Sequence, residues 1–428
     1  MMARFAGLAL SSMTALTLAP AQARAQAVGA GTSIVIAPRL DRSDAAGARI
    51  EPAFQPQPVP LGPVLALPSL SVAGGYDGNV FNRADAQAAS LAMIMPSLDL
   101  RANLPRHDFG LSAAGTLRRF SRYRSENSEE YRVAGHGRLD MGPGQTIKAS
   151  ADAAHLIEPR SSAGSVADAA EPVSYRRLAA EFGAGLTFGA LRFAPGLRYV
   201  RTDYDAVSLS GGGKADQSFR DTRTLRGEVR IDYDLSGLVS VFAAASCEDL
   251  DSPSAPADER RDAHSRTAVA GVRGAITPVI SGEVSLGYQS RDYALPAYRD
   301  VAGMTFRGDL QWYVTPLVTL RLQGSRTFRN SGNRQAGAIL TDSFLLSAYY
   351  DPLRNLRLSA SAGLERGDFG DVATRSWRTS LRVRAQYRLN RSLSIGGYVR
   401  FVRQDVSGPR LVNAFTSLGA GLGVTVTP

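Results

Sequence analysis

The sequence lacks the features on which two common classes of exported and membrane proteins depend. Cys247 is the only cysteine among 428 residues, so no intramolecular disulfide can form and the cross-links of small secreted domains are excluded. Beyond the N-terminus no apolar run reaches the roughly 20 residues that a membrane-spanning helix needs. Something other than disulfides or packed membrane helices must therefore stabilise the fold.

Residues and motifs that commonly serve in catalysis or metal binding are also scarce. The chain has 4 histidines, and no motif selects a serine nucleophile that would act with one of them. Neither paired cysteines or histidines at metal-ligand spacing nor a glycine-rich phosphate loop is present. We therefore expect no enzymatic activity, no catalytic residues, no cofactor and no metal site.

Lysine is nearly absent, because Lys148 and Lys214 are the only two, and arginine carries almost all of the positive charge behind the net +10. Nucleic acid is the usual partner of a basic protein, but these arginines are not clustered and the N-terminus predicts export. There Arg4 precedes an apolar stretch, and Ala-x-Ala frames follow over residues 21–27. This pattern is typical of a secretory signal peptide. We expect residues 1–25 to be removed, and we expect no nucleic-acid partner.

Residues 26–65 are a proline-rich segment in which no regular element can extend far. After export this segment would lie in the periplasm, either as a tail or as a plug that enters a lumen. Its prolines are Pro38, Pro52, Pro56, Pro58, Pro60 and Pro63.

From residue 66 to residue 428 apolar and polar residues alternate in runs of about ten, as they do in a strand with one face in lipid and the other in water. Residues 377–389 show this best, with Trp377 and Leu381 pointing one way and Arg378 and Arg382 the other. A helix would scatter these arginines around its circumference. The same alternation recurs in residues 225–233, 304–312 and 356–365.

Turn residues alternate between short and long connections along this region. Eight short turns rich in Pro, Gly, Asn or Asp are followed in each case by a longer polar segment. This is the pattern of an all-β, up-and-down antiparallel transmembrane barrel in a Gram-negative outer membrane, with about 18 strands (16 to 18) and both termini in the periplasm. The short turns lie at residues 103–106, 142–144, 189, 236–237, 277–278, 315–316, 351–355 and 390–391, and long segments at 158–172, 205–217, 251–262 and 330–335.

Strand parity directs more arginines than acids into the lumen. Roughly half of the arginines can pair with inward acids in a cross-strand lattice, and the surplus should favour anions, including acidic sugars, over cations. A barrel of this size is wide enough for an aqueous channel unless it is plugged. The predicted lumen and substrate-path residues are Arg226, Arg230, Arg307, Arg321, Arg357, Arg378, Arg382, Arg384, Arg388 and Arg400.

Several segments resemble a known family. Residues 67–72 and 76–81 are similar to the opening strand and first loop of outer-membrane β-barrel porins of the porin 2 type in α-proteobacteria, above all those found with exopolysaccharide biosynthesis. Further likeness lies at Arg119-Phe120, Glu126-Asn127 and Tyr131, at Glu171-Pro172 leading to Tyr175, and in the turn at residues 389–394.

The resemblance implies a pore-like barrel that serves export or surface assembly of a polysaccharide, with no catalytic residues to carry over. Alternatives are a general diffusion porin for small anions and a structural or receptor barrel that does not conduct. We expect as partners outer-membrane lipids, lipopolysaccharide, the barrel assembly machinery and, for an exporter, the polysaccharide and its export machinery. The last residue is Pro428, which departs from the terminal aromatic residue typical of such barrels.

Overall fold

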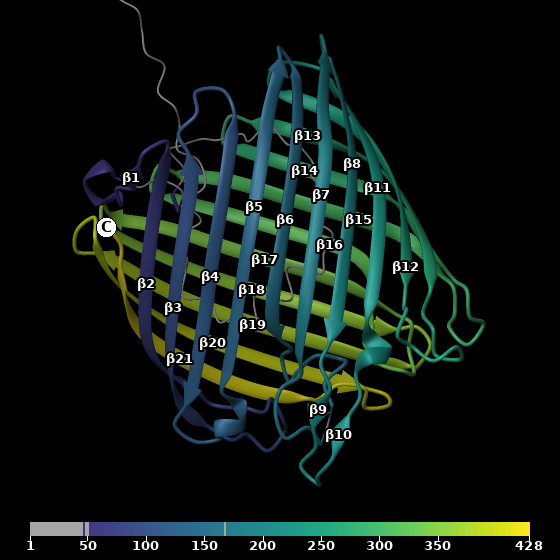
Figure 1. Cartoon of the computed structure of the whole chain (residues 1–428). Coiled ribbons are helices and arrows are strands. Elements are labelled where there is room, and N and C mark those ends of the chain that lie inside the picture. The colour runs from purple at the N-terminus through teal and green to yellow at the C-terminus, as the bar shows by residue number, and fades with distance from the viewer. Residues whose placement is uncertain (1–45, 48–50, 167) are drawn as a thin grey trace, which may run out of the picture.

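The computed structural model describes residues 46–47, 51–166 and 168–428. The predicted signal peptide and residues 26–45 lie outside the described residues. In the described part eighteen long strands form one closed antiparallel barrel, which confirms the predicted fold class and strand number (Figure 1). Closure joins β2 to β21, with Leu70 opposite Val426 and Asp77 opposite Gly419.

The barrel strands are 12 to 16 residues long, enough to cross a bilayer when they are tilted. Their bounds are β2 Val64–Asp77, β3 Ala89–Ala102, β4 Asp108–Phe120, β5 Ser128–Gly142, β6 Gln145–Ile157, β7 Ser174–Phe188, β8 Leu191–Tyr204, β11 Thr222–Asp234, β12 Val239–Asp251, β13 Ala263–Thr277, β14 Ile280–Tyr293, β15 Val301–Thr315, β16 Val318–Asn330, β17 Ala338–Leu353, β18 Leu356–Phe369, β19 Thr374–Arg388, β20 Leu393–Ser407 and β21 Phe415–Val426.

Short strands and 3-10 helices lie at the two ends of the barrel. The short strand β1, Val59–Leu61, pairs with the start of β2, and β9, Val207–Ser208, pairs with β10, Lys214–Ala215. Three single-turn 3-10 helices are η1, Pro52–Phe54, η2, Arg124–Glu126, and η3, Ser218–Arg220. None of the helices among the described residues has the length and apolar character to cross a membrane.

Short turns join the strands at one end of the barrel, called here the short-turn end, and longer connections join them at the other, the long-loop end. All eight predicted short turns are confirmed. Gly144 and Gly189 adopt φ values of +74° and +58° in two of them, a conformation that glycine reaches without steric cost. The β9–β10 hairpin projects from the long-loop end (Figure 1).

Side chains alternate between the outer surface and the lumen along each strand. In β19 the apolar residues Trp377, Leu381 and Val383 are exposed, and Arg378 and Arg382, which point to the opposite face, are partly covered. An exposed apolar belt around a polar interior is the pattern of a transmembrane barrel, and it matches the alternation in the sequence.

The N-terminal segment lies at the short-turn end. The first barrel strand begins at Val64, within the segment that the sequence assigns to the proline-rich linker. Gly47 N donates a hydrogen bond to Asp351 Oδ2 at 3.0 Å, and Gly47 lies against the ring of Tyr349, which faces the lumen from β17. The chain before β2 therefore reaches lumen-facing residues of a distant strand.

Candidate functional site: an arginine-lined lumen under a packed cap

All ten predicted arginines lie on the face of their strands opposite the exposed apolar side chains, and so in the lumen. They come from β11, β15, β16, β18, β19 and β20. Nine of them fall into two groups, one bound to carboxylates and one that forms a row on β19; the tenth, Arg307, lies on β15.

The first group is bound into a lattice of ion pairs. Arg230 is 2% exposed, and its guanidinium contacts Asp232 at 2.8 Å and Glu283 at 3.0 Å. It also stacks on Phe242, with 3.6 Å from Cζ to the ring centroid. A guanidinium so enclosed joins three strands and is not available to a solute. Carboxylates also hold Arg226, Arg321, Arg357 and Arg400 through Glu228, Asp309, Asp351 and Asp77.

The second group lies on β19, where arginines on the lumen face follow one another at intervals of two or four residues in the sequence. Among the described residues no carboxylate forms an ion pair with Arg378, Arg382 or Arg388. Arg384 stands in the same row. Successive inward positions of a strand are about 6.6 Å apart, so this row, the arginine ladder, presents repeated positive charge along one wall.

A long connection closes over the ladder. The connection between β6 and β7, described over residues 158–166 and 168–173 and called here the crossing loop, turns into the lumen, where Ser161 Oγ accepts a hydrogen bond of 2.6 Å from Arg378 Nη2. The loop reaches a wall formed by a strand far along the chain, and it therefore narrows the lumen.

Buried ion pairs fix the crossing loop at its base. Arg160 Nε donates to Glu126 Oε2 at 3.2 Å, and Arg160 Nη1 donates to Ala169 O at 3.0 Å. Arg220 Nη1 donates to Glu158 Oε2 at 2.9 Å. Burial alone would lower the pKa of the Arg220 guanidinium, but the Glu158 carboxylate outweighs burial and the pKa is raised. Arg220 thus stays charged and holds the loop.

The other long connections pack onto the crossing loop and form a cap over the long-loop end. Ala336, Phe369 and Val412 are buried together, and Ala163 of the crossing loop packs against them. Asp371 accepts hydrogen bonds from Gly337 N at 2.7 Å and from Arg299 N at 3.0 Å. A shared apolar cluster and hydrogen bonds between connections make the cap one packed body.

Arg261, from the connection between β12 and β13, forms hydrogen bonds with two other connections of the cap. It is 6% exposed and donates to Asn333 O at 3.2 Å and to Phe219 O at 3.3 Å. Burial lowers the pKa of this guanidinium, since it is desolvated, and no carboxylate forms an ion pair with it within the described part of the chain. Arg334 stacks on the Phe219 ring at 3.8 Å.

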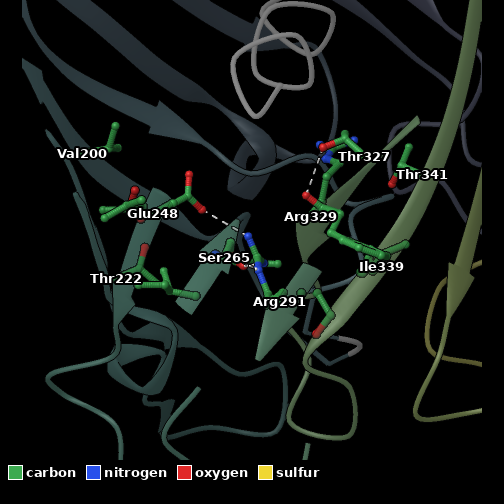
Figure 2. A pocket seen from close by; sticks show the side chains of 18 of the residues that line it. Val200, Thr222, Glu248, Ser265, Arg291, Thr327, Arg329, Ile339 and Thr341 are labelled. Carbon is green, nitrogen blue, oxygen red and sulfur yellow. Dashed lines mark hydrogen bonds and ion pairs between the residues drawn. The ribbon is translucent and has the colours of Figure 1, made fainter. Parts of the chain in front are cut away.

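A chamber of about 470 Å³ lies between the crossing loop and the lumen wall, and Figure 2 shows it from close by. Hydroxyl groups line much of it, and a hydrogen bond of 3.2 Å from Arg291 Nη2 to Glu248 Oε1 crosses one side. Its size falls within the roughly 300–1,000 Å³ of small-molecule sites. The hydroxyl-bearing side chains include Thr202, Thr222, Thr224, Ser265, Thr267, Thr327 and Thr341.

Some features of this site escaped the sequence reasoning. The polar segment 158–172 was predicted as a long connection, but the inward fold that brings Ser161 to Arg378 was not. Arg220 and Arg261 were not predicted as site residues, because both lie in connections where strand parity gives no direction. No signal in a single sequence marks these contacts between distant segments.

Among the described residues no three His, Cys, Asp or Glu side chains gather in a way that could hold a metal ion. Several acidic residues at the ends of strands form ion pairs with arginine, as Asp405 does with Arg403 at 2.9 Å.

Comparisons with known proteins agree with the barrel fold. The family model described as "Putative beta-barrel porin 2" matches residues 51–427. No curated protein matches the chain. Among solved structures, the copper transporter OprC has a TM-score of 0.51 at 9% identity, with 87% of this chain and 82% of that chain covered, a likeness of fold alone.

Two further solved structures are similar at lower scores. The Pseudomonas aeruginosa protein OccK2 (OpdF) has a TM-score of 0.45 at 11% identity, with 85% of this chain and 98% of that chain covered. The ferric citrate transporter FecA has a TM-score of 0.45 at 13% identity over 83% of this chain, which spans only 63% of FecA.

Proposed function

Because the chain belongs to the Putative beta-barrel porin 2 family, we propose that it is a non-enzymatic outer-membrane pore whose lumen passes anionic or neutral polysaccharide during export or surface assembly. The observation that carries the proposal is the contact of Ser161 with Arg378, because it places a narrowing loop directly on the arginine ladder. A lumen that carries positive charge and is covered by a cap at its long-loop end favours a pore whose cap moves aside when the polysaccharide passes.

In the proposed orientation the long-loop end faces outward and both termini lie in the periplasm. Exposed apolar residues such as Leu381 and Val383 face lipid, and the closed ladder of strands separates the lumen from the lipid. We expect lipopolysaccharide and other outer-membrane lipids to surround the barrel, the barrel assembly machinery to insert it, and export machinery to deliver polymer to its short-turn end. Association with exopolysaccharide biosynthesis in α-proteobacteria belongs to the same proposal.

A second candidate is a diffusion porin for small anions, which the positive charge of the arginine ladder favours. Such a porin conducts continuously, whereas the packed cap favours a closed resting state. Planar-bilayer recording separates the two. A barrel that stays closed until the cap is loosened fits the exporter, and a purified protein that is open and anion-selective without any change fits the porin. A third candidate, a receptor or structural barrel, predicts no conductance even after the cap is loosened.

Gene deletion tests the export role in the native cell. We expect polymer to stop reaching the medium while its synthesis continues, and expression of the chain in trans should restore it. Unchanged polymer in the medium of the deletion strain would overturn the export role and leave the porin as the better account.

A further inference from the structure

The chamber under the crossing loop has an unusual balance of charge. Four glutamates line it, and each has an arginine partner: Glu158 pairs with Arg220, Glu228 with Arg226 at 2.8 Å, Glu248 with Arg291 at 3.2 Å, and Glu365 with Arg329 at 3.8 Å. The acids of the chamber wall are therefore already matched by cations.

Four further arginines line the same chamber. Two of them have carboxylate partners, Arg177 with Asp152 at 3.4 Å and Arg198 with Glu181 at 3.2 Å. The other two are Arg261 and Arg378. Neither forms an ion pair with a carboxylate of the described residues, and their hydrogen-bond acceptors are neutral. Arg261 donates to the Asn333 and Phe219 carbonyls, and Arg378 donates to the Ser161 hydroxyl. The chamber therefore carries positive charge that its own wall does not balance, and an anion would be attracted to it.

The rest of the wall is suited to hydroxyl groups rather than to a bare ion. Thr222, Ser265, Thr327 and Thr341 line the chamber (Figure 2), and a hydroxyl both donates and accepts hydrogen bonds. Gln289 is 6% exposed, and its Nε2 atom has no acceptor among the described residues. A buried donor of this kind gains free energy when a ligand supplies an oxygen atom.

We propose that the chamber binds one carboxylated sugar, such as a hexuronate, and that the carboxylate replaces the Ser161 hydroxyl as the acceptor of Arg378. A charge-assisted hydrogen bond from guanidinium to carboxylate is stronger than one to a neutral hydroxyl. The ligand would therefore compete with the crossing loop for Arg378 and release the loop from the ladder. This inference rests on the proposed pore, and it names carboxylated sugars as the class of cargo that releases the crossing loop.

Titration calorimetry on the full barrel in detergent, with D-glucuronate as the probe, tests this inference. We expect D-glucuronate to bind, and its neutral methyl ester to bind at least roughly tenfold more weakly, because a charged hydrogen bond is lost. Arg378→Gln should weaken glucuronate to the level of the ester. Ser161→Ala removes the competing acceptor and should tighten glucuronate binding.

The matched control is Arg375→Gln, which removes the same charge from the exposed outer face of the same strand, at a residue that does not line the chamber. Its affinity for glucuronate should equal that of the native protein. Equal binding of glucuronate and its ester, or unchanged affinity in Arg378→Gln, would overturn the inference. A barrel that binds glucuronate in this pattern yet never conducts would overturn the pore and leave the binding site standing.

Discussion

Ser161 and Arg378 stand 217 positions apart in the chain, yet Ser161 Oγ lies 2.6 Å from Arg378 Nη2. One belongs to the connection between β6 and β7, and the other to the arginine ladder of β19. The contact joins the crossing loop, which narrows the lumen, to an arginine that forms no ion pair with a carboxylate of the described residues.

Shortening the crossing loop should open the lumen. Replacement of residues 160–166 by Gly-Ser removes Ser161 and the anchor Arg160, and we expect single-channel conductance in planar bilayers to rise several-fold. The control deletes Gly211 and Gly212 at the tip of the β9–β10 hairpin, where an added Cβ would meet no atom within 4 Å, and its conductance should equal that of the native protein. Equal conductance of the shortened-loop variant and the control would show that the loop does not limit passage.

Removing one partner of the buried pair between Glu158 and Arg220 should loosen the cap. Their side chains are 9% and 2% exposed, so Glu158→Gln leaves a desolvated cation, which typically costs about 3–5 kcal/mol. We expect much faster proteolysis of residues 158–173 with an intact barrel. The matched change is Glu129→Gln, whose pair with Arg119 is exposed, and such pairs contribute about 0–1 kcal/mol. Similar cleavage rates in the two variants would contradict this assignment.

Acid should loosen the segment around η3. Ser218 N and Ser218 Oγ donate to the Asp216 carboxylate at 2.9 and 2.8 Å, and these hydrogen bonds hold the pKa of Asp216 below its ordinary 3.8. Since the folded pKa is the lower one, this stabilisation is complete above the ordinary pKa and is lost as pH falls through the lowered value.

A spin label at Lys214→Cys, in a Cys247→Ser background, reports on this loosening. Its mobility should rise as pH falls below about 4. In a variant that also carries Asp216→Asn, the label should show no rise in mobility that depends on pH in this range. Identical pH profiles with and without the substitution would exclude Asp216 as the titrating group.

Much of the barrel could be predicted from the sequence because each strand carries its own evidence. The two-residue alternation that directs Trp377 outward and Arg378 inward is local, and so is the turn chemistry at Gly189. The number of strands follows from the turns, because eight short turns join sixteen strands and one further strand lies at each end. These features depend on near neighbours in the chain, and the structure confirms them.

The cap could not be predicted in this way, since its contacts join residues that are far apart in the sequence. Nothing in the segment around Ser161 specifies Arg378 as its partner. Strand parity placed Arg230 in the lumen with the ladder residues, but only packing against Phe242, Asp232 and Glu283 shows that it is enclosed. The sequence thus predicted where the arginines point. The structure separates those held by carboxylates from Arg378, Arg382 and Arg388, which form no ion pair with a carboxylate of the described residues.

The central claim, that the arginine ladder gives the opened lumen a preference for anions, is tested most directly by the reversal potential of the shortened-loop barrel in a KCl gradient. We expect chloride selectivity, with Arg378→Gln, Arg382→Gln and Arg388→Gln together abolishing most of it. Arg403→Gln, on the outer face of β20, should leave it unchanged. Potassium selectivity, or a chloride preference that the triple substitution does not reduce, would contradict the account.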